Sequence, residues 1–248
     1  MKQQNDLPNA ACLRLQGVHT HIGDYHILQG VDLQVERART TVLLGRNGAG
    51  KTTTLRTIMG MWKASQGEIE FNGKALKKMQ TADIAQLGIA YVPENMGVFS
   101  DLTVRENCLL AAKNGPLDTQ RLEWIFGFFP ALKKFWLSAA GNLSGGQKQM
   151  VAIARAMVEP RKLILVDEPT KGLAPSIVQN LLQAFQELKA TDTSILLVEQ
   201  NFNFVKQLGD QVFVMDEGRI VHSGGMQQLA DDDELQQQLL GLSLSAHQ

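Results

Sequence analysis

Long apolar runs are missing from this sequence of 248 residues. The uninterrupted ones, such as "LILV" and "ILLV", have the length of a strand. They fall far short of the roughly 20 residues that a helix needs to cross a bilayer. The first segment, "MKQQNDLPNA", is polar and contains no apolar signal region. We therefore expect a soluble cytoplasmic chain that crosses no membrane by itself.

An excess of charge of one sign is also lacking. The chain has 24 Lys and Arg against 25 Asp and Glu, a formal net charge of −1, without a basic stripe. Because nucleic-acid binding relies on clustered basic side chains, we expect no nucleic-acid partner.

Cysteine is scarce too. Cys12 and Cys108 lie far apart without metal-ligand spacing, which predicts reduced residues rather than a disulfide framework or a zinc site.

Predicted apolar strands alternate with predicted helices along most of the chain. The helices are expected over residues 52–61, 148–158 and 175–188, and the strands over 40–45, 89–94, 163–168 and 194–200. A short helix and a strand segment over 211–224 follow. This alternation predicts an α/β fold with a mainly parallel sheet covered on both faces.

The first part of the chain has a different pattern. Polar and apolar residues alternate over 12–22 and 27–36, which predicts antiparallel strands joined near Gly23 and Asp24. Residues 67–76 are typical of a hairpin that turns at Asn72-Gly73.

A third region, residues 102–136, is helical in pattern, dense in aromatics and broken at Pro116 and Pro130. We expect most of its aromatic side chains to form the core of a small helical subdomain. Some are candidates to line a groove for a partner helix, since exposed apolar patches often mark interfaces.

The most specific motif is "GRNGAGKTT", which lies between a predicted buried strand and a predicted helix and matches the phosphate-loop pattern. Its glycines let backbone N–H groups wrap phosphates closely, and the helix N-terminus adds a favourable partial charge. Lys51 is expected to reach the β- and γ-phosphates, and the Thr52 hydroxyl to ligate Mg²⁺. The predicted phosphate-binding set is Gly45, Asn47, Gly48, Ala49, Gly50, Lys51, Thr52 and Thr53.

Two carboxylates follow the apolar strand "LILV", at the sheet edge where ligands of α/β proteins bind. We expect Asp167 to hold Mg²⁺ through water. Glu168 is expected to polarise the attacking water, because phosphoryl transfer requires an aligned nucleophile. A helix cap is the ordinary alternative for such a pair, but the phosphate loop favours the catalytic interpretation.

A second candidate phosphate cradle is "LSGGQ", residues 143–147, where a Ser-Gly-Gly turn leads into an apolar helix. A cap with only a structural purpose is the alternative. Taken in order, "GRNGAGKTT", "LSGGQ" and "LILVDEPT" resemble the nucleotide-binding subunit of ATP-binding cassette (ABC) transporters. The resemblance covers roughly residues 13–225.

This resemblance implies a P-loop NTPase core with a mainly parallel sheet, an N-terminal antiparallel β subdomain and a small helical subdomain. The implied ATPase domain spans residues 11–225, with the helical subdomain at roughly 95–157. A peripheral C-terminal helix or tail is expected over 226–248.

The resemblance also implies partners. In the family, two subunits face each other head to tail, and the "LSGGQ" segment of one, called the signature, closes over the ATP of the other. A membrane permease and, indirectly, an extracytoplasmic solute-binding protein are implied, with the chain peripheral on the cytoplasmic face of the inner (plasma) membrane. The second half of each composite site would consist of Ser144, Gly145, Gly146 and Gln147.

Three short segments, "VPE", "GLAP" and "VEQN", resemble the ATP-binding subunits of uptake systems for branched-chain and other hydrophobic amino acids. Closely similar subunits serve urea and related amides. Glu94 stands where most of the family has Gln, which implies an added metal-ligating charge. Ala174 stands where many members have Asp. Gln200 replaces the switch histidine, so the resemblance implies a role beside Glu168 without a titrating ring.

The family usually places an aromatic residue before the Gly of the first hairpin, to stack on adenine. Here that position is Ile22, and Tyr25 and His21 are near enough to substitute. The alternative for Ile22 is apolar contact alone with the base, and a half-buried strand residue is the plainer interpretation of Tyr25.

The resemblance thus implies the ATP-hydrolysing subunit of an importer. One alternative is a soluble ABC ATPase that acts without a permease, but the sequence has no coiled-coil insertion, tandem cassette or basic surface. Another is a catalytically weak structural partner in a heterodimer. Intact Lys51, Asp167, Glu168 and "LSGGQ" disfavour it.

Overall fold

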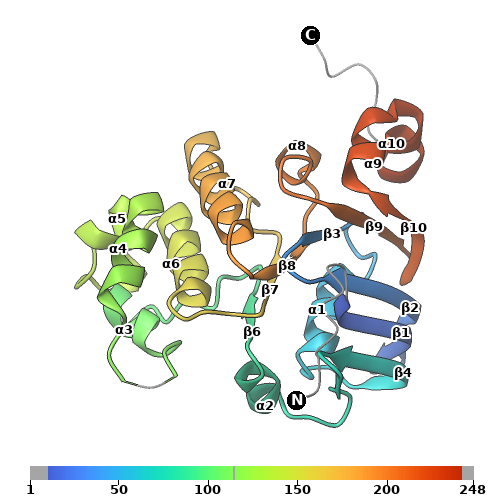
Figure 1. Cartoon of the computed structure of the whole chain (residues 1–248), viewed down its shortest axis with the longest axis horizontal. Helices are drawn as coiled ribbons and strands as arrows, with labels where there is room; N and C mark the ends of the chain where they lie inside the picture. The colour runs from blue at the N-terminus through green and yellow to red at the C-terminus, as the bar shows by residue number, and fades with distance from the viewer. Residues whose placement is uncertain (1–10, 114, 242–248) are drawn as a thin grey trace, which may run out of the picture.

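Two β-sheets organise the part of the chain that the computed structural model describes, residues 11–113 and 115–241 (Figure 1). The polar first segment lies outside the described residues. So does the end of the predicted C-terminal segment, residues 242–248. Within the described ranges, no helix is both long and apolar enough to span a membrane.

The larger sheet has the strand order β10-β9-β3-β8-β7-β6, and all neighbours run parallel except the edge pair of β9 and β10. Its middle strands β7 and β8 are buried throughout, as expected for strands that helices cover on both faces. The strands are β3 (Thr40–Gly45), β6 (Ile89–Val92), β7 (Leu163–Asp167), β8 (Ser194–Val198), β9 (Gln211–Asp216) and β10 (Arg219–Gly225).

The smaller sheet is antiparallel, in the order β2-β1-β4-β5, and it packs on one face of the larger sheet together with α1. Its hairpins turn at Gly23-Asp24 and at Asn72-Gly73, as the sequence predicts. The strand predicted from residue 67 begins three residues earlier, because pairing with β1 continues to Ala64. The strands are β1 (Ala11–Ile22), β2 (Tyr25–Glu36), β4 (Ala64–Phe71) and β5 (Lys74–Ala75).

The opposite face of the larger sheet packs against helices that form the second hydrophobic core. Four of these helices lie on the side marked green and yellow in Figure 1 and make up most of the helical region. They are α3 (Val104–Leu109), α4 (Thr119–Phe128), α5 (Pro130–Lys134) and α6 (Gly145–Met157). The others are α7 (Pro175–Lys189), α8 (Phe202–Val205), α9 (Met226–Asp231) and α10 (Asp233–Leu240).

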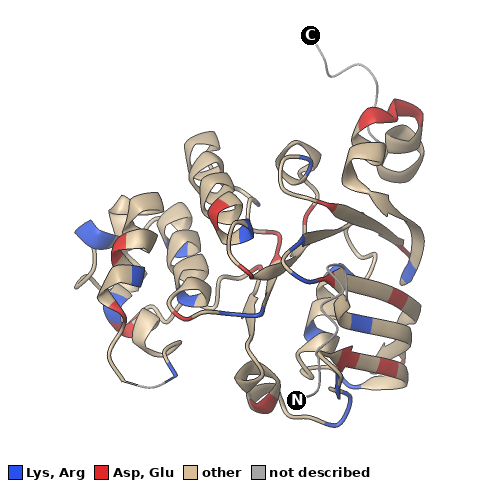
Figure 2. Ribbon diagram, in the orientation of Figure 1, with Lys and Arg blue, Asp and Glu red and all other residues tan. Residues whose placement is uncertain are grey.

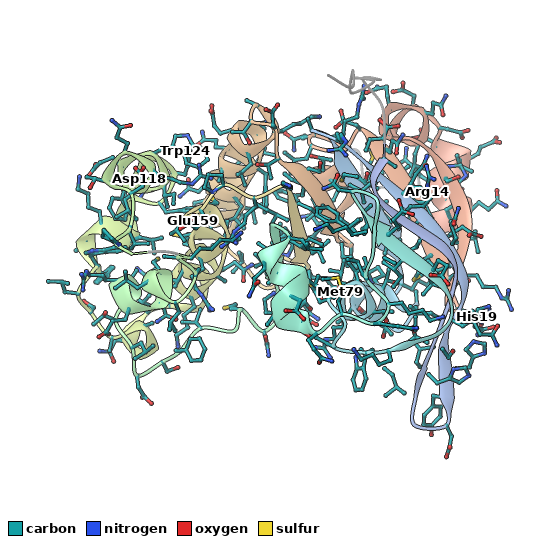
Figure 3. All side chains as sticks on the ribbon, turned by 60° about the horizontal axis from the view of Figure 1, so that its bottom comes forward. Arg14, His19, Met79, Asp118, Trp124 and Glu159 are labelled. Carbon is teal, nitrogen blue, oxygen red and sulfur yellow. The ribbon has the colours of Figure 1, made fainter. Side chains whose placement is uncertain are left out.

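The aromatic-rich segment contributes edge-to-face ring pairs within this region, Trp124 with Phe128 and Phe126 with Trp136. Phe129 is fully buried, whereas the other four rings are partly buried against the core. Figure 3 shows Trp124 on α4, close to the surface of the helical region. Most of this segment therefore serves packing, as expected.

Several predicted boundaries are wrong. α1 (Lys51–Ile58) ends before residue 61, because Gly60 has a positive φ of 70°. α6 begins at Gly145 rather than at 148, since Ser144 caps it. The short helix α2 (Thr81–Gln86) was not predicted, because only one of its residues, Ile84, is buried and no apolar period appears. Strands β6, β7 and β8 end before residues 93–94, 168 and 199–200, which the prediction had included.

These early strand ends position the chemistry. The parallel strands β3, β7 and β8 all end at one edge of the sheet, so the polar residues that follow them become neighbours. Basic and acidic residues are interspersed through the described fold (Figure 2). The strand order therefore brings these polar residues together at the sheet edge, without a large surface charge of one sign.

Candidate functional site

The glycine-rich loop connects β3 to α1 in a backbone conformation that requires glycine. Gly45, Gly48 and Gly50 have φ values of 151°, 83° and 109°. A Cβ added at Gly45 would lie 2.3 Å from the Met215 carbonyl oxygen, so no side chain fits there. No side chain caps the start of α1. Its first N–H groups are thus left for an external anion.

Lys51 lies inside this loop and is only 5% exposed. Its Nζ donates to the carbonyl oxygens of Gly45 at 2.9 Å and Arg46 at 3.1 Å. The same nitrogen is 3.4 Å from Oε1 of Glu168, which follows β7. The cation therefore lies between the phosphate loop and the candidate catalytic carboxylate.

Asp167 is fully buried at the end of β7 and accepts two hydrogen bonds. Thr52 Oγ1 donates to its Oδ1 at 3.1 Å, and the Tyr91 hydroxyl donates to its Oδ2 at 3.3 Å. Burial, together with the charges of Glu168 and Glu94, raises the pKa of Asp167 to about 6 despite these two donors. Burial and the charge of Asp167 raise the pKa of Tyr91 to about 12, so its hydroxyl remains a donor.

The pair of Thr52 and Asp167 fits a magnesium ion. Mg²⁺ prefers hydroxyl and carboxylate oxygens and keeps several waters or phosphate oxygens. An ionised carboxylate that is buried without a cation is costly, and a bound cation removes that cost. Tyr91 was not among the predicted residues, because its contact with Asp167 depends on the pairing of β6 with β7.

Glu168 directly follows β7 with a φ of +45°, a left-handed conformation that is unusual for glutamate. Burial disfavours its ionised form, but donation from Gln200 and the nearby charges of Lys51 and Lys171 outweigh this. The pKa of Glu168 is lowered as a result. The carboxylate is therefore ionised at neutral pH, the form that a general base requires.

Gln200 connects the two halves of the site. Its Nε2 donates to Glu168 Oε1 and to Asn47 Oδ1, both at 2.7 Å. The resemblance implied proximity of Gln200 to Glu168, and the structure brings them together. Whether this contact serves catalysis remains a prediction.

Glu94 forms an ion pair with Lys171, which was not among the predicted site residues. Lys171 Nζ donates to Glu94 Oε1 at 2.6 Å and lies 3.5 Å from Glu168 Oε2. Both contacts raise the pKa of Lys171. The predicted metal-ligating role of Glu94 thus competes with an ion pair. In the sequence, the one indication that Lys171 lies near the site was its position three residues after Glu168.

Ser144 is the N-cap of α6. Its Oγ accepts from the Gln147 N–H at 3.3 Å, and Gln147 Oε1 accepts from the Ser144 N–H at 2.9 Å. A Cβ added at Gly145 would meet nothing within 4 Å, so this helix start is open. Among the described residues, no hydrogen bond or ion pair joins residues 144–147 to the phosphate loop. In Figure 1, α6 and α1 lie on opposite sides of β7 and β8.

The hairpin end that was expected to contact adenine has one face toward α1, the helix that follows the phosphate loop. Thr20 is on that face, since its hydroxyl lies 3.2 Å from that of Thr57 in α1. Side chains alternate along a strand, so Ile22 shares this face. Tyr25 pairs directly with Ile22 and lies beside it, 76% exposed.

His21 belongs to the other face of the hairpin. Its ring stacks on His26, with centroids 4.2 Å apart, and His26 also contacts His19. Figure 3 shows His19 at the outer surface of the antiparallel sheet. His21 therefore lies on the face opposite the one that contacts α1, which leaves Ile22 and Tyr25 as candidates for contact with the base.

A groove of about 710 Å³ lies beside this site, between the larger sheet and the helical region. Two exposed apolar side chains, Met61 and Leu110, line it. Tyr91, which donates to Asp167, also lines the groove and so connects it to the sheet edge.

Comparisons with known proteins agree with this geometry. A family model described as "ABC transporter" matches residues 28–171 of the 248. The chain is 37% identical to the high-affinity branched-chain amino acid transport ATP-binding protein BraG of Pseudomonas aeruginosa, over 84% of this chain and 91% of that one. It is 32% identical to the probable branched-chain amino acid transport ATP-binding protein LivF of Archaeoglobus fulgidus, over 93% and 99%.

Among solved structures, the ADP conformation of MJ1267, an ATP-binding cassette of an ABC transporter, matches with a TM-score of 0.77 and 27% identity. The match covers 94% of this chain and all of the other. These matches confirm the P-loop α/β fold that the motifs predicted. Since the family match spans more than half of the sequence and the relatives are ATP-binding proteins, the chain belongs to the ABC transporter family, as an ATP-hydrolysing, ATP-binding subunit.

Proposed function

We propose that this chain energises the uptake of branched-chain or other hydrophobic amino acids through a partner permease. The convergence of Lys51, Asp167, Glu168 and Gln200 at one sheet edge carries the hydrolytic part of the proposal. The names of the relatives, which are branched-chain amino acid transport ATP-binding proteins, support the substrate class. Urea or a related amide is the second candidate substrate.

Residues of the phosphate loop, Lys51 first, would bind the β- and γ-phosphates of ATP. Thr52 and Asp167 would hold Mg²⁺, which would neutralise phosphate charge when bound. The ionised Glu168 is next to this position and would polarise the attacking water. Gln200 would orient Glu168 and contact the γ-phosphate with its amide.

A second subunit, identical or homologous, would complete each site. The open start of α6, with Ser144, Gly145, Gly146 and Gln147, would bind the γ-phosphate of the ATP held by the facing subunit. ATP binding would thus close the pair, and hydrolysis would open it. The binding energy would be converted into conformational work on the permease.

The groove beside the site is the candidate contact for the permease. Its exposed Met61 and Leu110 offer apolar surface, and Arg155 and Arg161 add positive charge at its wall. A groove that shares Tyr91 with the metal-holding Asp167 would connect the permease to the nucleotide site. The chain would then be peripheral, on the cytoplasmic face of the inner membrane, with an extracytoplasmic binding protein supplying the solute.

Uptake into proteoliposomes tests this function. With the permease, the solute-binding protein and this chain present, labelled leucine should accumulate only when ATP reaches the subunit. The Lys51→Ala variant should abolish accumulation without preventing assembly of the complex. An excess of unlabelled isoleucine or urea, added as a competitor, shows which of the two candidate substrates the complex takes up. Full ATPase activity with no binding to the permease and no uptake of any of these solutes would instead favour the soluble ABC ATPase.

Gln200→Ala should slow hydrolysis at least about tenfold with little change in ATP affinity, because Gln200 orients Glu168, and a positioned general base typically contributes about 10²- to 10⁴-fold. Gln200→His should remain active, since a neutral imidazole also offers a donor and an acceptor. Only in the Gln200→His variant should the ATPase rate change with the protonation of residue 200, near the unperturbed histidine pKa of about 6.5. Steady-state ATPase rates across pH in the assembled complex measure this, and a fully active Gln200→Ala enzyme would remove the role of Gln200.

A further inference from the structure

Glu199 is a buried carboxylate outside the set of predicted site residues. It follows β8 and is only 2% exposed. Its Oε1 accepts from the Thr170 N–H at 2.9 Å and from the Thr170 hydroxyl at 2.7 Å. Its Oε2 accepts from the N–H groups of Gln200 at 2.9 Å and Asn201 at 3.1 Å. Within residues 11–113 and 115–241, no Lys or Arg forms an ion pair with it.

These four donors come from the two loops that carry the hydrolytic residues. Thr170 lies two residues after Glu168, and Gln200 directly follows Glu199. Glu168 itself has a left-handed backbone, a conformation that persists only where its surroundings hold it. A single carboxylate therefore fixes the backbone on both sides of the 2.7 Å contact between Gln200 and Glu168.

We propose that Glu199 is a positioning residue for ATP hydrolysis, which acts by holding Gln200 against Glu168. The proposal rests on the proposed role of Gln200. A carboxylate suits this position because it offers two oxygens and no donor, so that each oxygen serves one loop. Charge-assisted hydrogen bonds to four donors also compensate the burial of its charge.

Glu199→Gln is the informative substitution because it keeps the size of the side chain. Its amide has one oxygen and one NH₂ group. Whichever way the amide turns, the NH₂ group faces N–H or O–H donors of one loop, and that loop loses its acceptor. We expect kcat to fall about tenfold, as for a misoriented general base. The KM for ATP should stay within about twofold, because Lys51 and the phosphate loop are unchanged.

The decisive measurement is a double-mutant cycle with Gln200→Ala, read as kcat in the assembled complex. If Glu199 acts through Gln200, Glu199→Gln should lower kcat no further once Gln200 is removed. If Gln200→Ala is slow by itself and the two substitutions have multiplicative effects on kcat, the role of Glu199 is overturned and that of Gln200 is kept. A wild-type rate for Gln200→Ala alone would overturn both roles.

Two further variants guard against simple loss of stability. Thr170→Val removes one donor to Glu199 and should lower kcat, whereas Thr170→Ser keeps the hydroxyl and should restore it. This pair keeps the proposal testable if Glu199→Gln fails to fold, and equal rates for the two would contradict it. Asp210→Asn is the control for lost stability, since Asp210 accepts the Thr40 N–H at 2.9 Å and pairs with Lys189 at 2.8 Å, at the opposite end of β3. It should lower the melting temperature and leave kcat unchanged.

Discussion

Glu168→Gln should bind ATP as the wild type does and lose about 10²- to 10⁴-fold in turnover, the range expected when a general base is removed. The lowered pKa of Glu168 means that the wild-type carboxylate is charged at neutral pH. The amide cannot accept a proton from water. Its oxygen still accepts from Gln200, so the geometry of the site should persist.

The same variant should trap the closed pair of subunits. In the proposed cycle hydrolysis opens the pair, so a chain that binds ATP without cleaving it should elute as a dimer in gel filtration with ATP and as a monomer without it. Glu187→Gln, on an exposed glutamate of α7, is the control and should keep wild-type turnover. Wild-type turnover by Glu168→Gln would assign the base to another residue.

Lys51→Ala and Ser144→Arg should each abolish turnover, for different reasons. Lys51 is the buried cation of the phosphate loop, so its loss should weaken ATP binding by the isolated subunit. Ser144→Arg should leave that binding unchanged. It places a bulky cation at the start of α6, where the helix already carries partial positive charge, and so should prevent closure over the ATP of the proposed facing subunit.

Fluorescent-ATP binding and ATPase rates separate these two failures. Asp118→Arg provides the matched control for the lost cap, because Asp118 caps α4 through the Arg121 N–H at 2.9 Å, away from the site. It should keep turnover. Ser144→Arg chains that fail to bind ATP as monomers would show that Ser144 acts within its own subunit.

The sequence predicted the parts of the site that are local in the chain. The phosphate loop is one motif between a strand and a helix, so its glycines, Lys51 and Thr52 are recognisable from spacing alone. Asp167 and Glu168 follow four apolar residues, which predicts the sheet edge that holds them. The alternation of strands and helices predicted the parallel sheet for the same reason.

The contacts between distant segments were not predictable in this way. Tyr91 reaches Asp167 across 76 positions, because β6 is the neighbour of β7 in the sheet. Lys171 meets Glu94 across 77 positions. Glu199 follows a strand like many surface glutamates, and its burial appears only when the Thr170 loop folds over it. Such contacts depend on strand order, which no local pattern specifies.

In the proposed pair, each ATP is held by the phosphate loop of one subunit and the "LSGGQ" segment of the other. The direct test counts trapped ATP in doubly tagged, purified pairs that carry Glu168→Gln throughout. In the first pair, one chain carries Lys51→Ala and the other Ser144→Arg. In the second pair, one chain carries both substitutions and the other neither. We predict one trapped ATP per pair in the first arrangement and none in the second. ATP trapped only in the second arrangement would contradict the claim.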